Sequence, residues 1–430
     1  MTVERIYDAI VAGAGPAGCR TARDLAIQGF DVLLLEEHRQ VGLPCHCSGL
    51  VTARTLALAG VDPSIILNTI RGATVHLGSG RSFSIGGDRV HAYVVDRPSL
   101  DQRLAEQAVA AGVELRFGSR FVHYRLEGSA TAGLDGLLVA TVREDNVEHE
   151  LRARLLVGAD GARSPVARQV RGGKEHGTLL GLGAQARYSA NPRPDHVELF
   201  VDDWAVPGWF GWTIPLAGGM SRIGTAGNDT LRPMASMARL RQRFPDSFGQ
   251  AEIISHTGGG IALWEPTPLL ADRVLLVGDA ARQVKPTSGG GIYAALNAAA
   301  LAAATATAAF HQADLSARGL GAYEQRWTAT DGQEMRRGHD LRRAFTKLSD
   351  SQFGQLAEAI ATSAGLTADV DRVGDIDAPS RIAWAIARRN PRLALGLATL
   401  PRFPRAWLHR ARMVNLAGVA GLVPLLEDAA

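Results

Sequence analysis

Cysteine is scarce in this 430-residue chain, which has only Cys19, Cys45 and Cys47. So low and odd a number argues against the disulfide framework of a secreted domain. Cys45 and Cys47 have no second pair with which to complete a zinc site, so we expect no metal. The first ten residues carry charges and no apolar signal core. These absences together predict a cytoplasmic protein.

Long apolar runs and lysines are also scarce. No segment reaches the roughly 18 uninterrupted apolar residues of a membrane span. The closest, residues 294–310, is rich in alanine but contains Asn297 and two threonines, so we predict a buried helix there. A net charge of only +3 gives no electrostatic footprint for nucleic acid, which we exclude as a partner. The first lysine of the chain is Lys174.

Acidic residues are missing between Asp377 and Glu427, where eight arginines alternate with leucine, alanine and tryptophan. A basic, apolar, Trp-containing helix is suited to the surface of an anionic bilayer. We therefore predict peripheral contact of residues 381–426 with the inner face of the cell membrane. The alternative is a helical subdomain with an Arg-rich face in water.

A glycine-rich turn follows the apolar strand predicted at residues 6–12. It reads Gly13-Ala14-Gly15-Pro16-Ala17-Gly18 and runs into a predicted helix. Gly13 permits the tight turn, Gly15 lets a pyrophosphate approach, and Gly18 lets the helix pack on the strand. Glu36 ends the next strand, where its carboxylate can accept from ribose hydroxyls. The pattern predicts a dinucleotide site on a helix N-terminus.

In two later segments, too, an apolar strand is predicted to end in a glycine-containing turn, here with an aspartate in the turn. Residues 155–168 contain Asp160, and residues 273–281 contain Asp279, which is placed to accept from a ribityl or ribose hydroxyl. Three consecutive glycines, the last two being Gly290 and Gly291, then lead through Ile292 into the Ala-rich helix. This helix start is a second anion cradle, suited to the electron-rich edge of a reduced isoalloxazine.

These three elements, in this order and spacing, resemble the glutathione-reductase-like FAD fold, in the branch of the aromatic hydroxylases. The resemblance covers about residues 5–330 and implies non-covalent FAD. In that branch an Arg-x-x-Leu-Asp turn also contacts FAD, which implies a cofactor contact for Arg97. Residues 181–186 fit a second dinucleotide motif superficially, but they precede alternating residues and prolines, so we predict a strand. The electron donor is then external, either NADPH or reduced ferredoxin.

The predicted fold class is α/β, with a discontinuous Rossmann-type FAD-binding domain, an inserted mixed or antiparallel substrate sheet, and a helical C-terminal region. We assign residues 1–70, 96–175 and 262–330 to the first domain. Residues 71–95 and 176–261 form the second, and residues 331–430 form the helical region.

Two local patterns resemble the geranylgeranyl reductase family, which saturates isolated double bonds of polyprenyl chains. Residues 44–47 match that family's Pro-x-x-Cys turn beside the flavin, which implies a flavin contact for Cys47. Cys47 and His46 are then the candidate proton donors. Residues 210–215 match its aromatic strand, with Phe and Ile in place of the usual Tyr and Phe, so the exact substrate stays open. The predicted substrate wall consists of Trp209, Phe210, Trp212 and Pro215.

The predicted activity is saturation of C=C bonds in a polyprenyl lipid, prenyl diphosphate or prenylated quinone by hydride from reduced flavin. Such chemistry needs an apolar wall that holds the alkene flat over the flavin and excludes water. An FAD-dependent aromatic monooxygenase and a membrane-docked flavoprotein that passes electrons to quinone are the alternatives. A flavin-dependent halogenase fits poorly, because its essential lysine in the first domain has no counterpart before Lys174.

Overall fold

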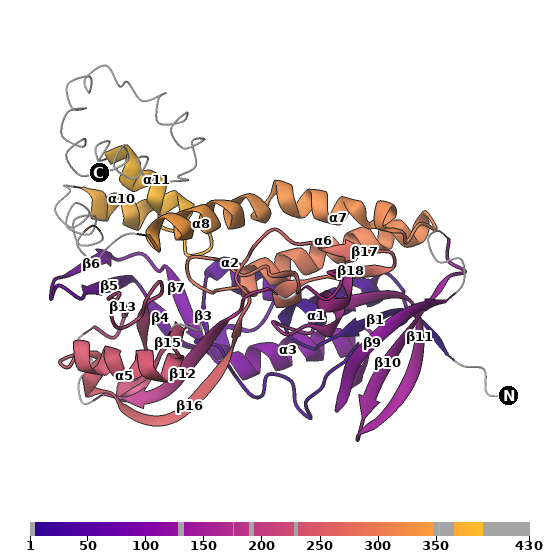
Figure 1. Cartoon of the computed structure of the whole chain (residues 1–430), viewed down its shortest axis with the longest axis horizontal. Helices are drawn as coiled ribbons and strands as arrows, with labels where there is room; N and C mark the ends of the chain where they lie inside the picture. The colour runs from indigo at the N-terminus through magenta and orange to yellow at the C-terminus, as the bar shows by residue number, and fades with distance from the viewer. Residues whose placement is uncertain are drawn as a thin grey trace, which may run out of the picture.

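A computed structural model describes residues 5–127, 133–174, 176–188, 193–227, 231–347, 352 and 365–389 (Figure 1). Its strands form three sheets, and its helices lie mainly above and below the first sheet. The helices are α1 (Pro16–Ile27), α2 (Ala53–Ala59), α3 (Arg97–Ala110), α4 (Pro165–Val170), α5 (Pro233–Arg243), α6 (Ile292–His311), α7 (Ala317–Ala329), α8 (Asp331–Phe345), α10 (Leu366–Val373) and α11 (Ser380–Arg389). Short 3₁₀ turns are η1 (Pro63–Ile65), η2 (Ala217–Gly219), η3 (Phe248–Gln250) and η4 (Gly278–Ala281).

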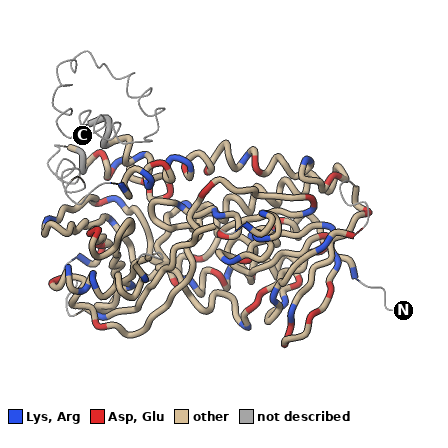
Figure 2. Tube along the Cα trace, viewed as in Figure 1, with Lys and Arg blue, Asp and Glu red and all other residues tan. Residues whose placement is uncertain are grey.

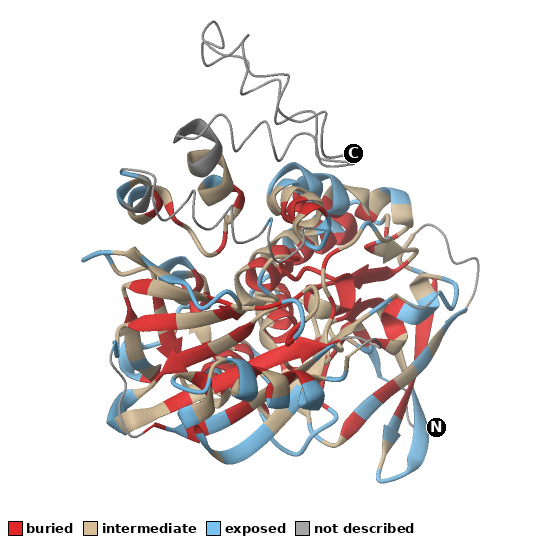
Figure 3. Cartoon of the chain, turned by 60° about the vertical axis from the view of Figure 1, so that its left-hand side comes forward, coloured by how far each residue is buried: buried red, intermediate tan, exposed pale blue. Residues whose placement is uncertain are grey.

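The first sheet has a parallel centre that is buried on both faces. β1 pairs in parallel with β2 and β11, β2 with β8, and β11 with β18, while β9, β10 and β17 add antiparallel partners. Its strands are β1 (Ile6–Ala12), β2 (Val32–Leu35), β8 (Glu114–Arg116), β9 (Ser119–Glu127), β10 (Leu137–Glu144), β11 (Val147–Gly158), β17 (Leu270–Ala271) and β18 (Val274–Leu276). The apolar runs of β2 and β18 are fully buried, as parallel central strands require. Figure 3 shows the buried residues, in red, concentrated in the inner strands and helices.

The second sheet has seven strands in the order β16-β12-β15-β14-β13-β5-β6, and only the β13–β5 pair is parallel. These strands are β5 (Gly72–Leu77), β6 (Ser82–Gly86), β12 (Leu179–Arg187), β13 (His196–Val201), β14 (Gly211–Pro215), β15 (Met220–Gly227) and β16 (Glu252–Ile261). A third, small sheet joins β3 (Leu50–Val51), β4 (Ile66–Ile70) and β7 (Ala92–Val95). Residues 181–186 lie in β12, so the prediction of a strand there is confirmed.

The predicted βαβ unit and Ala-rich helix are present. β1 has the predicted bounds, β2 ends directly before Glu36 as predicted, and α1 begins at Pro16, inside the predicted glycine turn. α6 is apolar and long enough to cross a membrane by length and composition, but 56% of its most apolar window is buried in the protein. Its alanines pack against α1, as expected for a core helix.

The mixed α/β class with an FAD-binding fold is confirmed, whereas the domain boundaries stay a prediction. β5 and β6 share a sheet with β12 to β16, as the inserted domain requires, but β7 belongs to the small third sheet. α8, α10 and α11 represent the C-terminal helices, and residues 390–426 of the predicted membrane contact lie outside the described residues. Along the described chain, residues of both charge signs are intermixed (Figure 2).

Candidate active site

A continuous cavity of about 1620 Å³ extends from the first sheet to the second. Its walls include the glycine turn after β1, the loop at residues 42–48, strands of the second sheet and the C-terminal helices. Typical pockets for one small ligand have volumes of about 300–1,000 Å³. The cavity therefore has room for a dinucleotide and for a second, elongated molecule beside it.

The glycines of the first turn meet three different steric demands. Gly13 has a φ of +98°, and a Cβ there would lie 2.5 Å from the carbonyl oxygen of Ala159. A Cβ on Gly18 would lie 1.9 Å from the carbonyl oxygen of Gly13, so the α1–β1 packing excludes any side chain. A Cβ on Gly15 would meet no atom within 4 Å, and Gly15 lines the cavity. The open space at Gly15 fits a pyrophosphate at the start of α1.

Pro16 and Ala17 form the first turn of α1 and also line the cavity. Glu36 stands opposite, at the end of β2. Its Oε2 accepts from the backbone N of Ala14 at 3.0 Å, and its Oε1 accepts from the backbone N of His38 at 2.9 Å. These donors fix the carboxylate at the cavity edge, in the position expected for ribose binding.

Asp160 and Asp279 both line the cavity, but in different ways. The Asp160 carboxylate accepts from the Ser164 hydroxyl and from the backbone N of Val166 at 3.2 Å, so it also holds the start of α4. Burial raises the pKa of Asp160 to about 6. Burial likewise raises the pKa of Asp279 to about 6, against the opposing effect of Arg97 and Arg282. Asp279 lies in η4, beside the glycines before α6, and a Cβ on Gly291 would be 3.2 Å from its Oδ1.

Gly290, Gly291 and Ile292 line the cavity where α6 begins. Gly291 is the N-cap and offers no side-chain acceptor, so the first N–H groups of a 20-residue helix remain available at the cavity. Such a start attracts negative charge. The helix start predicted as a second anion cradle therefore faces the cavity, and its binding of an anion stays a prediction.

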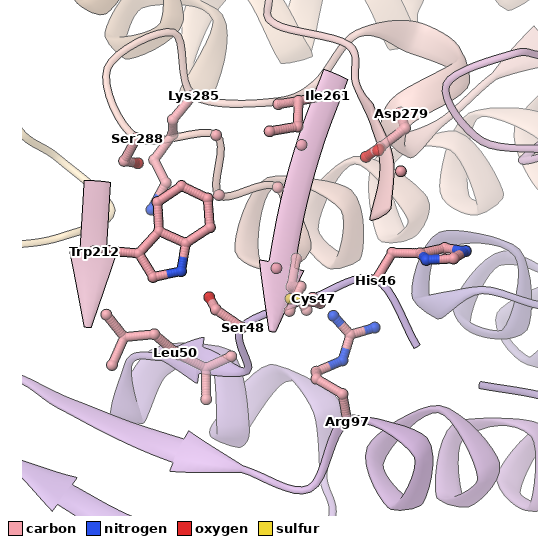
Figure 4. Close-up of a pocket in the computed structure, with 18 of the residues that line it drawn as sticks. His46, Cys47, Ser48, Leu50, Arg97, Trp212, Ile261, Asp279, Lys285 and Ser288 are labelled. Atoms are coloured by element: carbon pink, nitrogen blue, oxygen red, sulfur yellow. The ribbon is translucent and has the colours of Figure 1, made fainter. Parts of the chain in front are cut away.

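Arg97 and Cys47 face each other at the centre of the cavity (Figure 4). Arg97 is buried and donates through Nη2 to both carboxylate oxygens of Asp101, at 2.7 and 2.8 Å. Its buried Nε has no hydrogen-bond partner among the described residues. Although burial opposes it, the pKa of Arg97 is raised by Asp101 and by the Cys47 thiol. The Cys47 sulfur accepts a weak bond from the backbone N of Gly49 at 3.4 Å.

The side chains of the two candidate proton donors, His46 and Cys47, point in different directions. His46 is exposed, and its ring points away from Cys47 and Arg97 (Figure 4). Its Nδ1 lies 3.1 Å from the Thr257 hydroxyl, and its Cβ packs beside Gly259. Burial and the nearby His38 lower the pKa of His46. Of the two, Cys47 is better placed to reach a substrate.

Three of the four predicted wall residues line the cavity. Trp209 stacks on Phe210 with ring centroids 4.9 Å apart, and Phe210 meets Trp212 edge-on at 5.9 Å. The prediction that Pro215 belongs to the substrate wall is wrong, because Pro215 is buried and is not among the residues that line the cavity. Residues 210, 212 and 214 face the cavity, so the two-residue period of a strand turns Pro215 to the other side.

The sequence reasoning missed the rest of the apolar wall. On the adjacent strands β5 and β13, alternate residues face the cavity: Ala73 and Val75, and Val197, Leu199 and Val201. Val370, Ile376 and Ile382 contribute from the C-terminal helices and the loop between them. The alternation is visible in each strand, but only the parallel pairing of β5 with β13 shows that the two stripes form one surface.

A buried ion pair closes the cavity near the glycines before α6. Lys285 Nζ donates to Asp377 Oδ1 at 2.9 Å and to the carbonyl oxygen of Ile376 at 2.8 Å. Asp377 also accepts from the Thr52 hydroxyl at 2.5 Å. The loop between α10 and α11 is thereby fixed to the FAD-binding fold. No group of His, Cys, Asp and Glu within the described ranges could hold a metal ion.

The fold and the cavity define an FAD-dependent oxidoreductase with an apolar chamber beside its cofactor site. An FAD binding domain model matches residues 6–179. The digeranylgeranylglycerophospholipid reductase of Methanosarcina acetivorans is 31% identical over 83% of this chain and 88% of its own. That of Methanothrix thermoacetophila is 28% identical over 90% and 97%. The chain belongs to the geranylgeranyl reductase family.

Solved structures share the fold. A geranylgeranyl bacteriochlorophyll reductase-like protein from Thermoplasma acidophilum superposes with a TM-score of 0.80 and 23% identity, covering 93% of this chain and all of that one. A flavin-dependent brominase gives 0.67 and 19%, over 90% of this chain and all of its own. At these identities the likeness concerns the fold alone. The curated relatives are reductases, which does not favour the monooxygenase alternative.

Proposed function

We propose that this protein uses reduced FAD to saturate isolated C=C bonds of a polyprenyl chain carried by a lipid, a diphosphate or a quinone. The observation that carries the proposal is the continuity of the dinucleotide site with an apolar chamber in one cavity. An elongated chain can lie in this chamber with an alkene next to the cofactor. The relatives named as reductases of digeranylgeranyl lipids support this substrate class.

The first and the third of the predicted elements contribute residues that would hold FAD. Gly15 and the start of α1 would take the pyrophosphate, Glu36 the ribose, and Asp279 with the start of α6 the flavin end. Arg97, with its unpaired Nε, would donate from the opposite side. Bound and reduced, FAD supplies a hydride to one carbon of the alkene.

The chain's own residues supply the remaining requirements. Trp209, Phe210 and Trp212 form an aromatic wall that orients the alkene and excludes water. The other alkene carbon needs a proton, and the Cys47 thiol at the centre of the cavity is placed to give it (Figure 4). Arg97 would stabilise the thiolate until water returns the proton.

Three parts of the proposal concern partners. The electron donor is external, either NADPH or a reduced ferredoxin. The protein works in the cytoplasm, at the inner face of the cell membrane. There residues 381–426 contact anionic lipid, and this is supported by their sequence of arginines, leucines and tryptophans.

An anaerobic assay of the reduced holoenzyme tests the activity. A menaquinone, geranylgeranyl diphosphate and a polyprenol are each offered, and mass spectrometry should show one H₂ gained per saturated bond. Lipid of unchanged mass beside fully reduced flavin would contradict the proposal.

Cys47→Ala separates the reductase from a quinone-linked electron carrier. Alkene saturation should fall about 100-fold or more, as loss of a general acid predicts, whereas electron transfer to a soluble quinone should persist. Cys45→Ala is the matched control. The thiol that it removes is already engaged, because it donates to the backbone carbonyl of Cys47. Full saturation activity in the Cys47 variant would favour the carrier.

A further inference from the structure

Arg342 on α8 is a cavity-lining cation without an anionic partner in the part of the chain that the structure describes. Its guanidinium lies 4.7 Å above the ring of Trp209, and no carboxylate of the described residues lies within ion-pair distance. Burial alone lowers the pKa of Arg342 to about 10, with no charged group contributing. The group still carries its charge at neutral pH. A half-buried charge without a partner is costly, which points to a ligand that supplies one.

The other cations that line the middle of the cavity are already engaged. Arg97 pairs with Asp101, and Lys285 pairs with Asp377. Arg222 donates to the backbone carbonyls of Ser48 and Val95 at 2.7 and 2.9 Å. Arg342 thus differs from these neighbours, because its guanidinium makes no hydrogen bond or ion pair with any side chain or carbonyl of the described residues.

Two further unsatisfied donors lie around the same end of α8. Trp209 Nε1 is buried without a hydrogen-bond partner among the described residues, and so is the hydroxyl of Thr287. Both residues line the cavity. Gly338 precedes Arg342 by one helical turn and so shares its face, and a Cβ on Gly338 would be 3.7 Å from the Thr287 methyl. The ring of Trp209 in turn abuts Gly289, where a Cβ would lie 3.5 Å from Trp209 Cζ2.

We propose that Arg342, with Trp209 Nε1 and the Thr287 hydroxyl, binds the phosphate ester at the end of the prenyl substrate. Three donors from three chain segments suit the tetrahedral oxygens of a phosphate, and a guanidinium fork binds two of them together. The prenyl chain then extends from this anchor along the apolar stripe of β13 and β5. The inference rests on the proposed function, because it specifies the charged end of that substrate.

Equilibrium binding to the oxidised, FAD-loaded enzyme tests the anchor without turnover. Geranylgeranyl diphosphate and geranylgeraniol are titrated against the wild type, Arg342→Gln and Arg342→Lys, with the flavin spectrum as the signal. We expect Arg342→Gln to weaken diphosphate binding about 10- to 100-fold, the range for a charged hydrogen bond, and to leave the alcohol unchanged. Arg342→Lys should recover part of the loss. Arg343→Gln, an exposed neighbour on α8, is the matched control and should bind like the wild type.

The remaining arms identify the source of the phosphate. Inorganic diphosphate should compete with geranylgeranyl diphosphate in the wild type and lose this ability in Arg342→Gln. If Arg342→Gln lost affinity equally for the diphosphate and for the alcohol, Arg342 would contribute only packing to the cavity, and the proposal would be overturned. NADPH is titrated against the same variants, and a loss of affinity confined to NADPH would assign the site to the electron donor and overturn the proposal. Binding that follows the expected pattern in an enzyme that saturates no alkene would refute the proposed function and not the anchor.

Discussion

Lys285 and Asp377 form an ion pair in which both side chains are less than a tenth exposed, with Nζ and Oδ1 2.9 Å apart. The two residues belong to the loop before α6 and to the loop before α11. Removing one partner of a buried pair leaves an uncompensated charge. Asp377→Asn should therefore destabilise the protein by about 3–5 kcal/mol in urea unfolding.

Arg143→Gln is the control for this ion pair. Arg143 pairs with Glu148 at 2.6 Å, but its side chain is 44% exposed. An exposed pair contributes at most about 1 kcal/mol. An equal loss of unfolding free energy in the two variants would show that the Lys285–Asp377 pair stabilises the protein no more than a surface pair does.

Gly15 and Gly18 should respond oppositely to alanine. Gly15→Ala should fold normally, because its Cβ enters open space, but it should bind FAD far more weakly. Gly18→Ala should fail to fold, because its Cβ would lie 1.9 Å from a backbone oxygen. The flavin-to-protein absorbance ratio and the circular-dichroism melting curve of the apoprotein measure the two effects separately. A Gly15→Ala protein with a full flavin complement would contradict the pyrophosphate assignment.

Asp279 gives the apoprotein a pH dependence. Its folded pKa of about 6 is above the ordinary 3.8, so the folded state binds more protons than the unfolded state between these values. Its contribution to stability therefore falls as pH rises from about 4 to about 6. Asp279→Asn should remove this part of the decline and make the apoprotein more stable than the wild type at pH 8. Urea unfolding at pH 5 and pH 8 measures the free energy of unfolding of both proteins. An equal decline of this free energy in the wild type and in Asp279→Asn would show that Asp279 does not cause the pH dependence.

Gly224 sets the position of Trp212. The two residues pair across β14 and β15, and a Cβ on Gly224 would be 2.4 Å from the indole. Gly224→Ala should displace the indole and raise the KM for a prenyl substrate about 10-fold, the result of losing roughly 1.4 kcal/mol of contact, with an unchanged flavin spectrum. Gly177→Ala, where a Cβ meets nothing within 4 Å, is the control. An unaltered KM would remove Trp212 from the substrate wall.

Truncation after residue 389 tests the membrane contact while keeping α11, which lines the cavity. The shortened protein should leave anionic liposomes in a flotation assay, since most of the arginines are lost. Vesicles of neutral lipid are the control and should bind neither protein. Retained binding to anionic vesicles would refute the tail as the attachment site.

The FAD-binding fold could be predicted because its signals are local. A glycine turn between an apolar strand and a helix specifies the conformation of a few successive residues, and Gly13 and Gly18 show why the chain tolerates nothing else there. The substrate side depends on pairing between distant segments. Pro215 was wrongly assigned because a motif names its residues without saying which face of the strand each occupies. Arg342 carried no sequence signal, since only the fold brings α8 over Trp209.

The apolar stripe of β5 and β13 faces residues that belong to the last described stretch of the chain, 365–389. During synthesis the cofactor turn of β1 emerges from the ribosome long before Ile376 and Ile382 do. A nascent chain can thus build its nucleotide site while the chamber is still open along one side. A chain that ended before residue 365 would lack Val370, Ile376 and Ile382, so its chamber would be open on the side that these residues cover.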